Sequence, residues 1–137
     1  MVKQCECLDE AMFVDAESAL STELARCDVV LDAIFGFSFR GEPREPFKSV
    51  LSALQRSGKL IVSVDIPSGW DVEKGAPPHE SLEPDMLVSL TAPKRCALGF
   101  KGSHHYLGGR FVPPEITQKY DLVLPSYEGS KQCVPIG

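Results

Sequence analysis

Hydrophobic residues recur along the chain with a helical period in two places. The clearer helix is predicted over residues 46–56, whose apolar residues recur at i, i+3, i+4 and i+7. Four residues form that apolar face: Phe47, Val50, Leu51 and Leu54. Pro46 suits the first helical turn, and Gly58 can supply a left-handed cap after the last one. A shorter amphipathic helix is predicted over residues 16–26.

Short apolar runs rich in branched residues predict buried strands over residues 29–35, 60–66 and 86–90. The first two runs flank the clearer helix, so they form a βαβ unit with parallel strands and a right-handed crossover. A fourth, shorter strand is predicted over residues 109–112, and a last helical turn over residues 113–120. Alternating strands and helices indicate a layered α/β fold.

Composition places the chain among ordinary globular domains. It has 137 residues, of which 43% are hydrophobic and 24% charged, enough for one domain with a real core. The net charge of −5 argues against broad electrostatic binding of nucleic acid or of an anionic membrane. The start of the chain lacks the apolar segment of a secretory signal, and it does not read as an Arg-rich transit peptide.

The five cysteines are odd in number and irregular in spacing, which favours free thiols in a reducing compartment. A zinc site that combines Cys5 and Cys7 with His104 and His105 is disfavoured by the spacing.

Polar residues follow the predicted strands, where ligands bind in open parallel sheets. Asp32 lies late in the first strand and Asp65 at the end of the second. Ser68 follows in the next loop, and Lys94 follows the third strand. Each aspartate can simply accept backbone N–H groups from a turn. Together they also suit a cation site, a ribose hydroxyl contact or a general base.

The loop over residues 36–42 directly follows the first predicted strand. Its glycines allow close backbone approach, and Ser38 and Arg40 can hold a phosphate. The alternative is an ordinary surface loop with two phenylalanines tucked beneath it. His104 suits proton transfer, although such histidines more often cap loops or face solvent. Trp70 is expected to pack beneath its own loop.

Four segments carry a family resemblance: Val30-Leu31-Asp32-Ala33-Ile34-Phe35-Gly36-Phe37-Ser38-Phe39-Arg40-Gly41, Val64-Asp65-Ile66-Pro67-Ser68-Gly69-Trp70-Asp71-Val72, Leu90-Thr91-Ala92-Pro93-Lys94 and Tyr106-Leu107-Gly108-Gly109-Arg110-Phe111-Val112-Pro113-Pro114. Over about residues 28–125 the chain resembles NAD(P)H-hydrate epimerase, the YjeF N-terminal domain family, also called apolipoprotein A-I-binding protein. The resemblance implies a Rossmann-like three-layer α/β/α sandwich with a mostly parallel sheet. It also implies interconversion of the R and S forms of hydrated NADH and NADPH (NADHX and NADPHX).

The resemblance implies a set of site residues and partners. Asp32 and Ser68 match potassium ligands, and oxygen donors suit a hard cation. Asp65 matches a substrate-contacting acid and, with Lys94 beside it, is our candidate acid/base. The loop matches the substrate-phosphate contacts: Gly36, Phe37, Ser38, Phe39, Arg40, Gly41 and Glu42. Expected partners are the substrate NAD(P)HX, a dehydratase that restores the S form, an apolipoprotein and a second copy in a homodimer, with no nucleic acid and no membrane. The resemblance implies a mitochondrial or cytoplasmic location.

The chain departs from the family pattern at its start. The family's domain begins with further α/β units that carry a G-N-N-G-G-D-G loop, whereas residues 1–27 contain no glycine. We therefore expect residues 1–137 to be the C-terminal portion of a single domain, with an unpaired sheet edge and an exposed apolar face. A non-catalytic binding module is the alternative function. RNA binding is a third class, disfavoured by the net charge.

Overall fold

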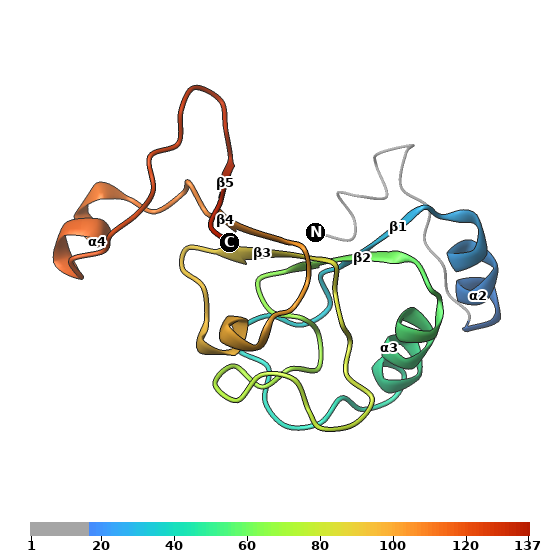
Figure 1. The fold of residues 1–137 in the computed structure, drawn as a ribbon. Helices are drawn as coiled ribbons and strands as arrows, with labels where there is room; N and C mark the ends of the chain where they lie inside the picture. Colours follow the sequence, from blue (N-terminus) through green and yellow to red (C-terminus); the bar gives the residue numbers. More distant parts are fainter. Residues whose placement is uncertain (1–16) are drawn as a thin grey trace, which may run out of the picture.

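The strands of the sheet lie side by side in the order in which they occur in the chain. The computed structural model describes residues 17–137, so the expectations for residues 1–14 and for Cys5 and Cys7 lie outside it. The elements are α2 (Glu17–Arg26), β1 (Val29–Asp32), α3 (Phe47–Arg56), β2 (Leu60–Val64), β3 (Met86–Leu90), the 3-10 helix η1 (Arg95–Gly99), β4 (His104–Gly108), α4 (Pro114–Lys119) and β5 (Cys133–Pro135) (Figure 1).

The sheet has the order β1-β2-β3-β4-β5 and is mostly parallel. Strands β1 to β4 pair in parallel, and β5 is antiparallel to β4. The predicted parallel βαβ unit is therefore confirmed, as are both predicted helices of the N-terminal half. Pro46 stands just before α3 as its N-cap rather than inside its first turn. Gly58 is left-handed, with φ of 66°, as a cap requires.

One face of the sheet is covered by α2, α3 and the loops after the strands. Its core consists of Val30, Leu54, Ile61 and Leu82, against which Leu24 of α2 packs. A second cluster joins Ile66, Trp70 and Cys96 beneath the loop that follows β2. Trp70 is buried there as predicted, and its indole N–H donates to the carbonyl of Leu82 at 2.9 Å.

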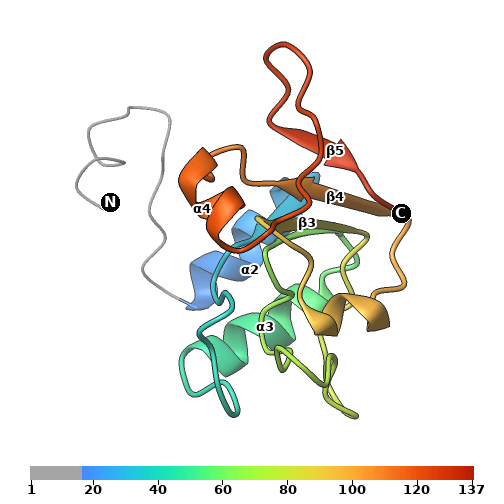
Figure 2. The ribbon, with the colours of Figure 1, turned by 90° about the vertical axis from the view of Figure 1, so that its left-hand side faces the viewer.

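Among residues 17–137, little covers the opposite face of the sheet, as expected from the departure from the family pattern. Of this part of the chain, Figures 1 and 2 show α3 and η1 on one side of the sheet, and α4 with its flanking loops on the other. Leu31 is 66% exposed and Leu60 58%, because they alternate with the core residues and face away from the helices. Within the described residues, β1 pairs with β2 alone and forms one edge of the sheet.

In the C-terminal half one strand prediction was wrong and one strand was missed. The fourth strand is β4 over His104–Gly108, and residues 109–112 leave the sheet. Gly109 has φ of 103°, a turn conformation that ends the strand. His104 and His105 were interpreted as part of a loop because they are polar and adjacent, but pairing with β3 holds them in a strand. The short strand β5 was not predicted, since its three residues depend on β4 for pairing.

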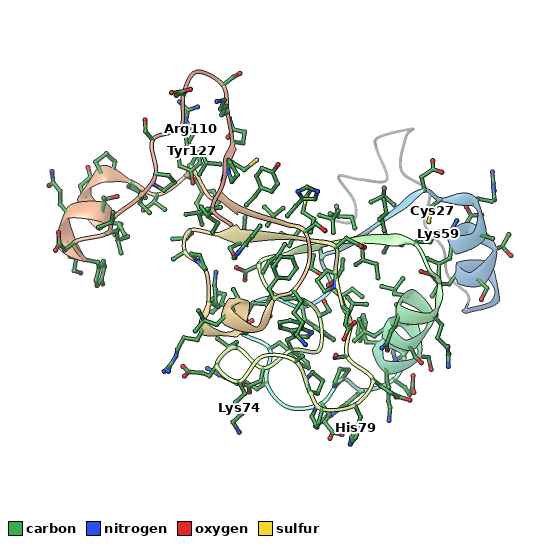
Figure 3. The ribbon with its side chains drawn as sticks, viewed as in Figure 1. Cys27, Lys59, Lys74, His79, Arg110 and Tyr127 are labelled. Atoms are coloured by element: carbon green, nitrogen blue, oxygen red, sulfur yellow. The ribbon has the colours of Figure 1, made fainter. Side chains whose placement is uncertain are left out.

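The segment between β4 and β5 forms an arm that stands away from the sheet. It contains α4, which was predicted as a last helical turn. Figure 3 labels Arg110 at the base of this arm. Arg110 donates to the carbonyls of Gly129 at 2.5 Å and Lys131 at 3.2 Å, which ties the two ends of the arm together. No helix within residues 17–137 has the length and apolar content needed to span a bilayer.

Candidate functional site

Asp32 lies at the carboxyl end of β1, on the helix-covered face, and is only 1% exposed. Its Oδ2 accepts a hydrogen bond from the Ser63 hydroxyl at 2.7 Å and from the Ser68 backbone N–H at 2.9 Å. The backbone N–H of Ile34 approaches Oδ1 at 3.5 Å. All three donors are neutral, and none of the ion pairs found in residues 17–137 involves Asp32. The carboxylate is thus buried and hydrogen-bonded, with its charge unmatched by a basic side chain.

The loop after β1 is fastened to the loop after β2 by two hydrogen bonds. The backbone N–H of Phe35 donates to the Ser68 hydroxyl at 2.9 Å. The backbone N–H of Phe37 donates to Oδ2 of Asp65 at 3.0 Å. A Cβ at Gly36 would lie 3.2 Å from that same Oδ2, so glycine gives the carboxylate room to approach. Residues far apart in sequence therefore meet at one rim of the sheet.

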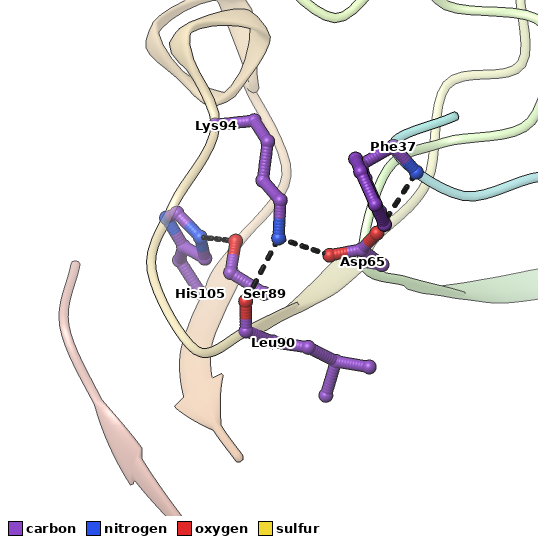
Figure 4. Close-up of polar contacts among 6 residues, drawn as sticks. All are labelled: Phe37, Asp65, Ser89, Leu90, Lys94 and His105. Carbon is purple, nitrogen blue, oxygen red and sulfur yellow. Dashed lines mark hydrogen bonds and ion pairs between the residues drawn. The ribbon is translucent and has the colours of Figure 1, made fainter. Parts of the chain in front are cut away.

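Asp65 has both carboxylate oxygens held by this chain (Figure 4). Oδ2 accepts from Phe37, and Oδ1 forms an ion pair with Nζ of Lys94. Lys94 also donates to the carbonyl of Leu90 at 2.8 Å, at the end of β3. The Lys94 and Asp65 side chains are 20% and 11% exposed. The pair is thus fixed in place at the rim while each group keeps some access to solvent.

The backbone is left-handed at the ends of two neighbouring strands. Asp65 follows β2 with φ of 70°, and Thr91 follows β3 with φ of 67°. This region is unfavourable for residues with a side chain, above all for a β-branched one such as threonine. Such strain persists only where the surroundings impose it, and it concentrates at functional sites.

A histidine and a serine pair beside this rim, also drawn in Figure 4. His105 of β4 lies with its Nε2 2.9 Å from the hydroxyl of Ser89, which is fully buried in β3. The ring of Phe100 packs edge-on against the imidazole, with centroids 5.5 Å apart. Burial lowers the pKa of His105 below its ordinary value. His104 points to the opposite face and is exposed, so it is not part of this group.

Two hollows adjoin the loop over residues 36–42. One, of about 500 Å³, is lined by Phe35, Phe39, Arg40 and Phe47 among others. The rings of Phe35 and Phe39 stack there with centroids 4.3 Å apart. Thus Phe39 is tucked in, as one alternative predicted, whereas Phe37 is 64% exposed.

The other hollow, of about 450 Å³, lies between this loop, the first turns of α3 and the loop over residues 74–82. Gly41, Glu42 and Ser68 line it. Lys74 and His79, also part of its lining, lie in the loop farthest from the sheet in Figure 3. The predicted phosphate loop therefore faces two separate hollows rather than one.

The structure brings the predicted site residues to one rim. Asp32 and Ser68 are in direct contact, as are Asp65 and Lys94, and the loop over residues 36–42 joins the two pairs. The loop positions that the sequence nominated fall into three groups. Gly36 and Phe37 lie against Asp65. The hollows are lined by Phe39, Arg40, Gly41 and Glu42, whereas Ser38 is exposed and lines neither.

Sequence reasoning missed Ser63 and the pair of Ser89 and His105. Ser63 stands opposite Asp32 in the register of β1 and β2, and both side chains point to the covered face. The signal was a serine within an otherwise apolar strand, since a buried hydroxyl requires a partner. The same signal applies to Ser89 in β3.

The expected potassium ion can be tested against the donors of this chain. Within residues 17–137 no group of three or more His, Cys, Asp or Glu side chains is arranged to hold a metal. Asp32 and Ser68 instead offer one carboxylate and one hydroxyl oxygen, and no basic side chain among the described residues forms an ion pair with Asp32. Hard cations prefer such oxygen donors, so the two residues fit part of the coordination shell of a monovalent ion.

Fold and site define the class of protein: an open, mostly parallel, Rossmann-like α/β sheet with polar residues at the carboxyl ends of its strands. A family model described as YjeF-related protein N-terminus matches residues 2–96. The chain belongs to this family.

The chain is also similar to two longer proteins. The crystal structure of the yeast protein YNL200c superposes with a TM-score of 0.87 at 36% identity, covering 98% of this chain and 58% of the yeast chain. A chloroplastic protein of Arabidopsis thaliana, named pyridoxine/pyridoxamine 5'-phosphate oxidase 1, is 55% identical over 119 residues. That match covers 80% of this chain and 22% of the Arabidopsis protein. The chain thus spans little more than a fifth of one relative and under two thirds of the other.

Proposed function

We propose that this chain takes part in the epimerisation of hydrated nicotinamide cofactors, NADHX and NADPHX. The observation that carries the proposal is the convergence at one rim of the Asp32–Ser68 pair, the Asp65–Lys94 pair and the loop between them. Membership of the YjeF-related N-terminal family supports it. The activity, substrate and partners of a whole protein of this family are part of the proposal.

Substrate binding is assigned to the loop over residues 36–42. Arg40 lines the hollow that contains the stacked Phe35 and Phe39. A guanidinium can bind a phosphate through two parallel hydrogen bonds, and an aromatic surface suits a flat ring. The left-handed Gly41, with φ of 81° and open space at its Cβ position, lets the backbone approach a ligand closely.

The chemical step is assigned to Asp65, with Lys94 as the group that positions it. Epimerisation needs the hydroxyl-bearing carbon of the reduced ring to lose and regain its substituent, or the ring to open and close. A carboxylate that is held by one ion pair and one N–H still has lone pairs free to accept and return a proton. Proton transfer by a positioned group contributes about 10²–10⁴-fold to a rate.

Potassium is assigned to Asp32 and Ser68. When bound, the ion would supply a positive charge close to the rim where the anionic substrate lies. The residues of this chain hold the carboxylate ready for it, because Ser63 and the Ser68 N–H fix the position of Oδ2.

The test is the conversion of R-NADPHX by the purified chain, followed with a dehydratase that consumes only the S form. We expect Asp65→Asn to lower the rate by about 100-fold or more, since the loss removes a proton-transfer group. Asp28→Asn, an exposed acid just before β1, is the matched control and should leave the rate unchanged. An Asp65→Asn variant that folds and retains the full rate would refute the role of Asp65.

A second candidate is a non-catalytic binding module, for which an apolipoprotein or a second copy of the chain is a proposed partner. The observation in its favour is that a 55%-identical stretch makes up only 22% of a longer protein that is named for a different reaction, as an accessory module would. The same assay separates the two candidates. Conversion by the chain alone supports the epimerase, whereas no conversion beside an active full-length family member supports the binding module.

A further inference from the structure

The pair of Ser89 and His105 is a buried polar contact that the proposed chemical step does not use. The Ser89 hydroxyl lies 2.9 Å from Nε2 of His105, and Ser89 is fully buried in β3. The register places His105 opposite Leu87, so its ring reaches diagonally along β3 toward the rim to meet Ser89. The ring of Phe100 packs edge-on against the imidazole. The imidazole is therefore held between β3 and the chain that follows η1.

Ser89 lies between two backbone carbonyls that hold the two members of the Asp65–Lys94 pair. The residue before it, Val88, accepts the backbone N–H of Asp65 at 2.8 Å. The residue after it, Leu90, accepts Nζ of Lys94 at 2.8 Å (Figure 4). A displacement of Ser89 would therefore move the supports of the carboxylate and of the ammonium together.

The backbone bends sharply directly after Leu90. The N–H of Ala92 donates back to the same Leu90 carbonyl at 2.7 Å, and Thr91 between them is left-handed, with φ of 67°. A β-branched residue adopts this conformation only where its surroundings impose it. The direction of the Leu90 carbonyl thus depends on how the last residues of β3 are held, and the hydroxyl of Ser89 fastens the residue before the bend to His105.

Stability alone does not require a polar pair at this place. Replacing both partners of a buried hydrogen bond by apolar groups of similar shape can be nearly neutral. The neighbours of the pair on the same face of the sheet, Leu87 and Leu107, are apolar and buried. Burial lowers the pKa of His105, so its ring is mainly neutral at pH 7. A hydrogen bond differs from an apolar contact in its preferred direction, so the pair can fix orientation as well as position.

We propose that His105 is a positioning residue for the Asp65–Lys94 pair. By bonding the Ser89 hydroxyl, its imidazole sets the direction of the Leu90 carbonyl. That carbonyl in turn aims the Lys94 ammonium at the Asp65 carboxylate. The consequence for catalysis rests on the proposed function of Asp65, whereas the placement of Lys94 can be measured without catalysis.

The first measurement is the ¹⁵N chemical shift of Lys94 Nζ in the full 137-residue chain, detected by NMR through the neighbouring carbon-bound protons. Asp65→Asn supplies the shift of an ammonium that has lost its ion pair. We expect His105→Leu to move the Nζ shift in the same direction. His105→Gln keeps a polar group that can bond Ser89, so it should leave the shift close to its original value. His104→Leu is the matched control, since His104 is exposed on the other face of β4.

The second measurement separates kcat from KM for the conversion of R-NADPHX. We expect His105→Leu to lower kcat about tenfold with KM unchanged, because a misplaced proton-transfer group affects the chemical step rather than binding. The double variant Ser89→Ala/His105→Leu replaces both partners by apolar groups. Its kcat should fall equally, while its urea midpoint stays close to that of the original chain. A purely structural pair would change kcat only together with the urea midpoint.

Three results would overturn the proposal in chains that circular dichroism shows to be folded. They are an unchanged Nζ shift in both His105→Leu and the double variant, an unchanged kcat in both, and a His105→Gln variant as defective as His105→Leu. No conversion by the original chain would count against the proposed function of the chain alone, and the Nζ shift would still decide whether His105 positions Lys94.

Discussion

Ser63→Ala tests how much the hydrogen bond from the Ser63 hydroxyl to the buried Asp32 carboxylate contributes to the stability of the fold. The Ser63 hydroxyl lies 2.7 Å from Oδ2, and both side chains are shielded from water. Water cannot replace the lost donor without opening the core. A hydrogen bond to a charged group contributes about 1.5–3 kcal/mol to stability.

We therefore expect Ser63→Ala to lower the free energy of unfolding by about 2 kcal/mol. Urea unfolding measures the change. At a slope of about 2 kcal/mol per molar urea, the midpoint should fall by about 1 M. Ser89→Ala is the matched control, since Ser89 is equally buried but bonds an imidazole rather than a carboxylate. Ser89→Ala should lower the free energy of unfolding by only about 1 kcal/mol, the typical contribution of a hydrogen bond between neutral groups.

A double-mutant cycle isolates the contribution of charge. In an Asp32→Asn background the cost of Ser63→Ala should fall to that of Ser89→Ala, because the acceptor is then neutral. Equal costs for the two serine variants in the original chain would refute the reasoning, as would a Ser63→Ala cost unchanged by Asp32→Asn. Either result would mean that Asp32 is not held as a buried anion.

Two further predictions concern the strands around the site. Because burial lowers the pKa of His105 from its ordinary value of 6.5, the unfolded chain takes up a proton more readily. The stability that this residue contributes is complete above pH 6.5 and is lost as the pH falls through the lowered pKa of the folded state. The urea midpoint of the original chain should therefore fall between pH 7.5 and pH 5. His105→Gln should make this fall smaller, whereas His104→Gln should leave it unchanged. Equal pH dependence in both variants would contradict this. Gly109→Ala should cost more than about 2 kcal/mol, because φ is 103° and the added Cβ would lie 2.6 Å from the backbone nitrogen of Thr91. Gly129 has φ of 55° and open space at its Cβ position, so Gly129→Ala should lower the free energy of unfolding by only about 1 kcal/mol in the same assay. Equal decreases for the two glycine variants would show that the contact with the Thr91 nitrogen does not matter.

The N-terminal half of the fold was predictable because its apolar patterns are strong and local. The helical period around Leu51 and the branched runs of β1 and β2 each specify one element without help from the rest of the chain. The end of β1 was not predicted. Ala33 to Phe35 continue the apolar run, but the Phe35 N–H bonds to Ser68 and the chain leaves the sheet.

The C-terminal half was less predictable, because pairing between strands decides it. His104 and His105 have no marked strand preference, and it is β3 beside them that keeps them extended. Strand β5 has three residues and exists only through β4. The rim, by contrast, was predictable, since Asp32, Asp65 and Lys94 follow parallel strands whose carboxyl ends must share one edge. What the sequence could not provide was which donor contacts which acceptor, as with Ser63 and Asp32.

The left-handed backbone at Asp65 and Thr91 costs stability at this rim. A residue with a side chain loses about 1–2 kcal/mol in that conformation, and glycine would avoid the loss. The chain nevertheless carries a carboxylate at one position and a hydroxyl at the other. Engineering this protein for heat resistance by the usual glycine substitution would at Asp65 also remove the acceptor of the Lys94 and Phe37 contacts. On the proposed role of Asp65, a more robust molecule and a competent one therefore call for different amino acids at this position.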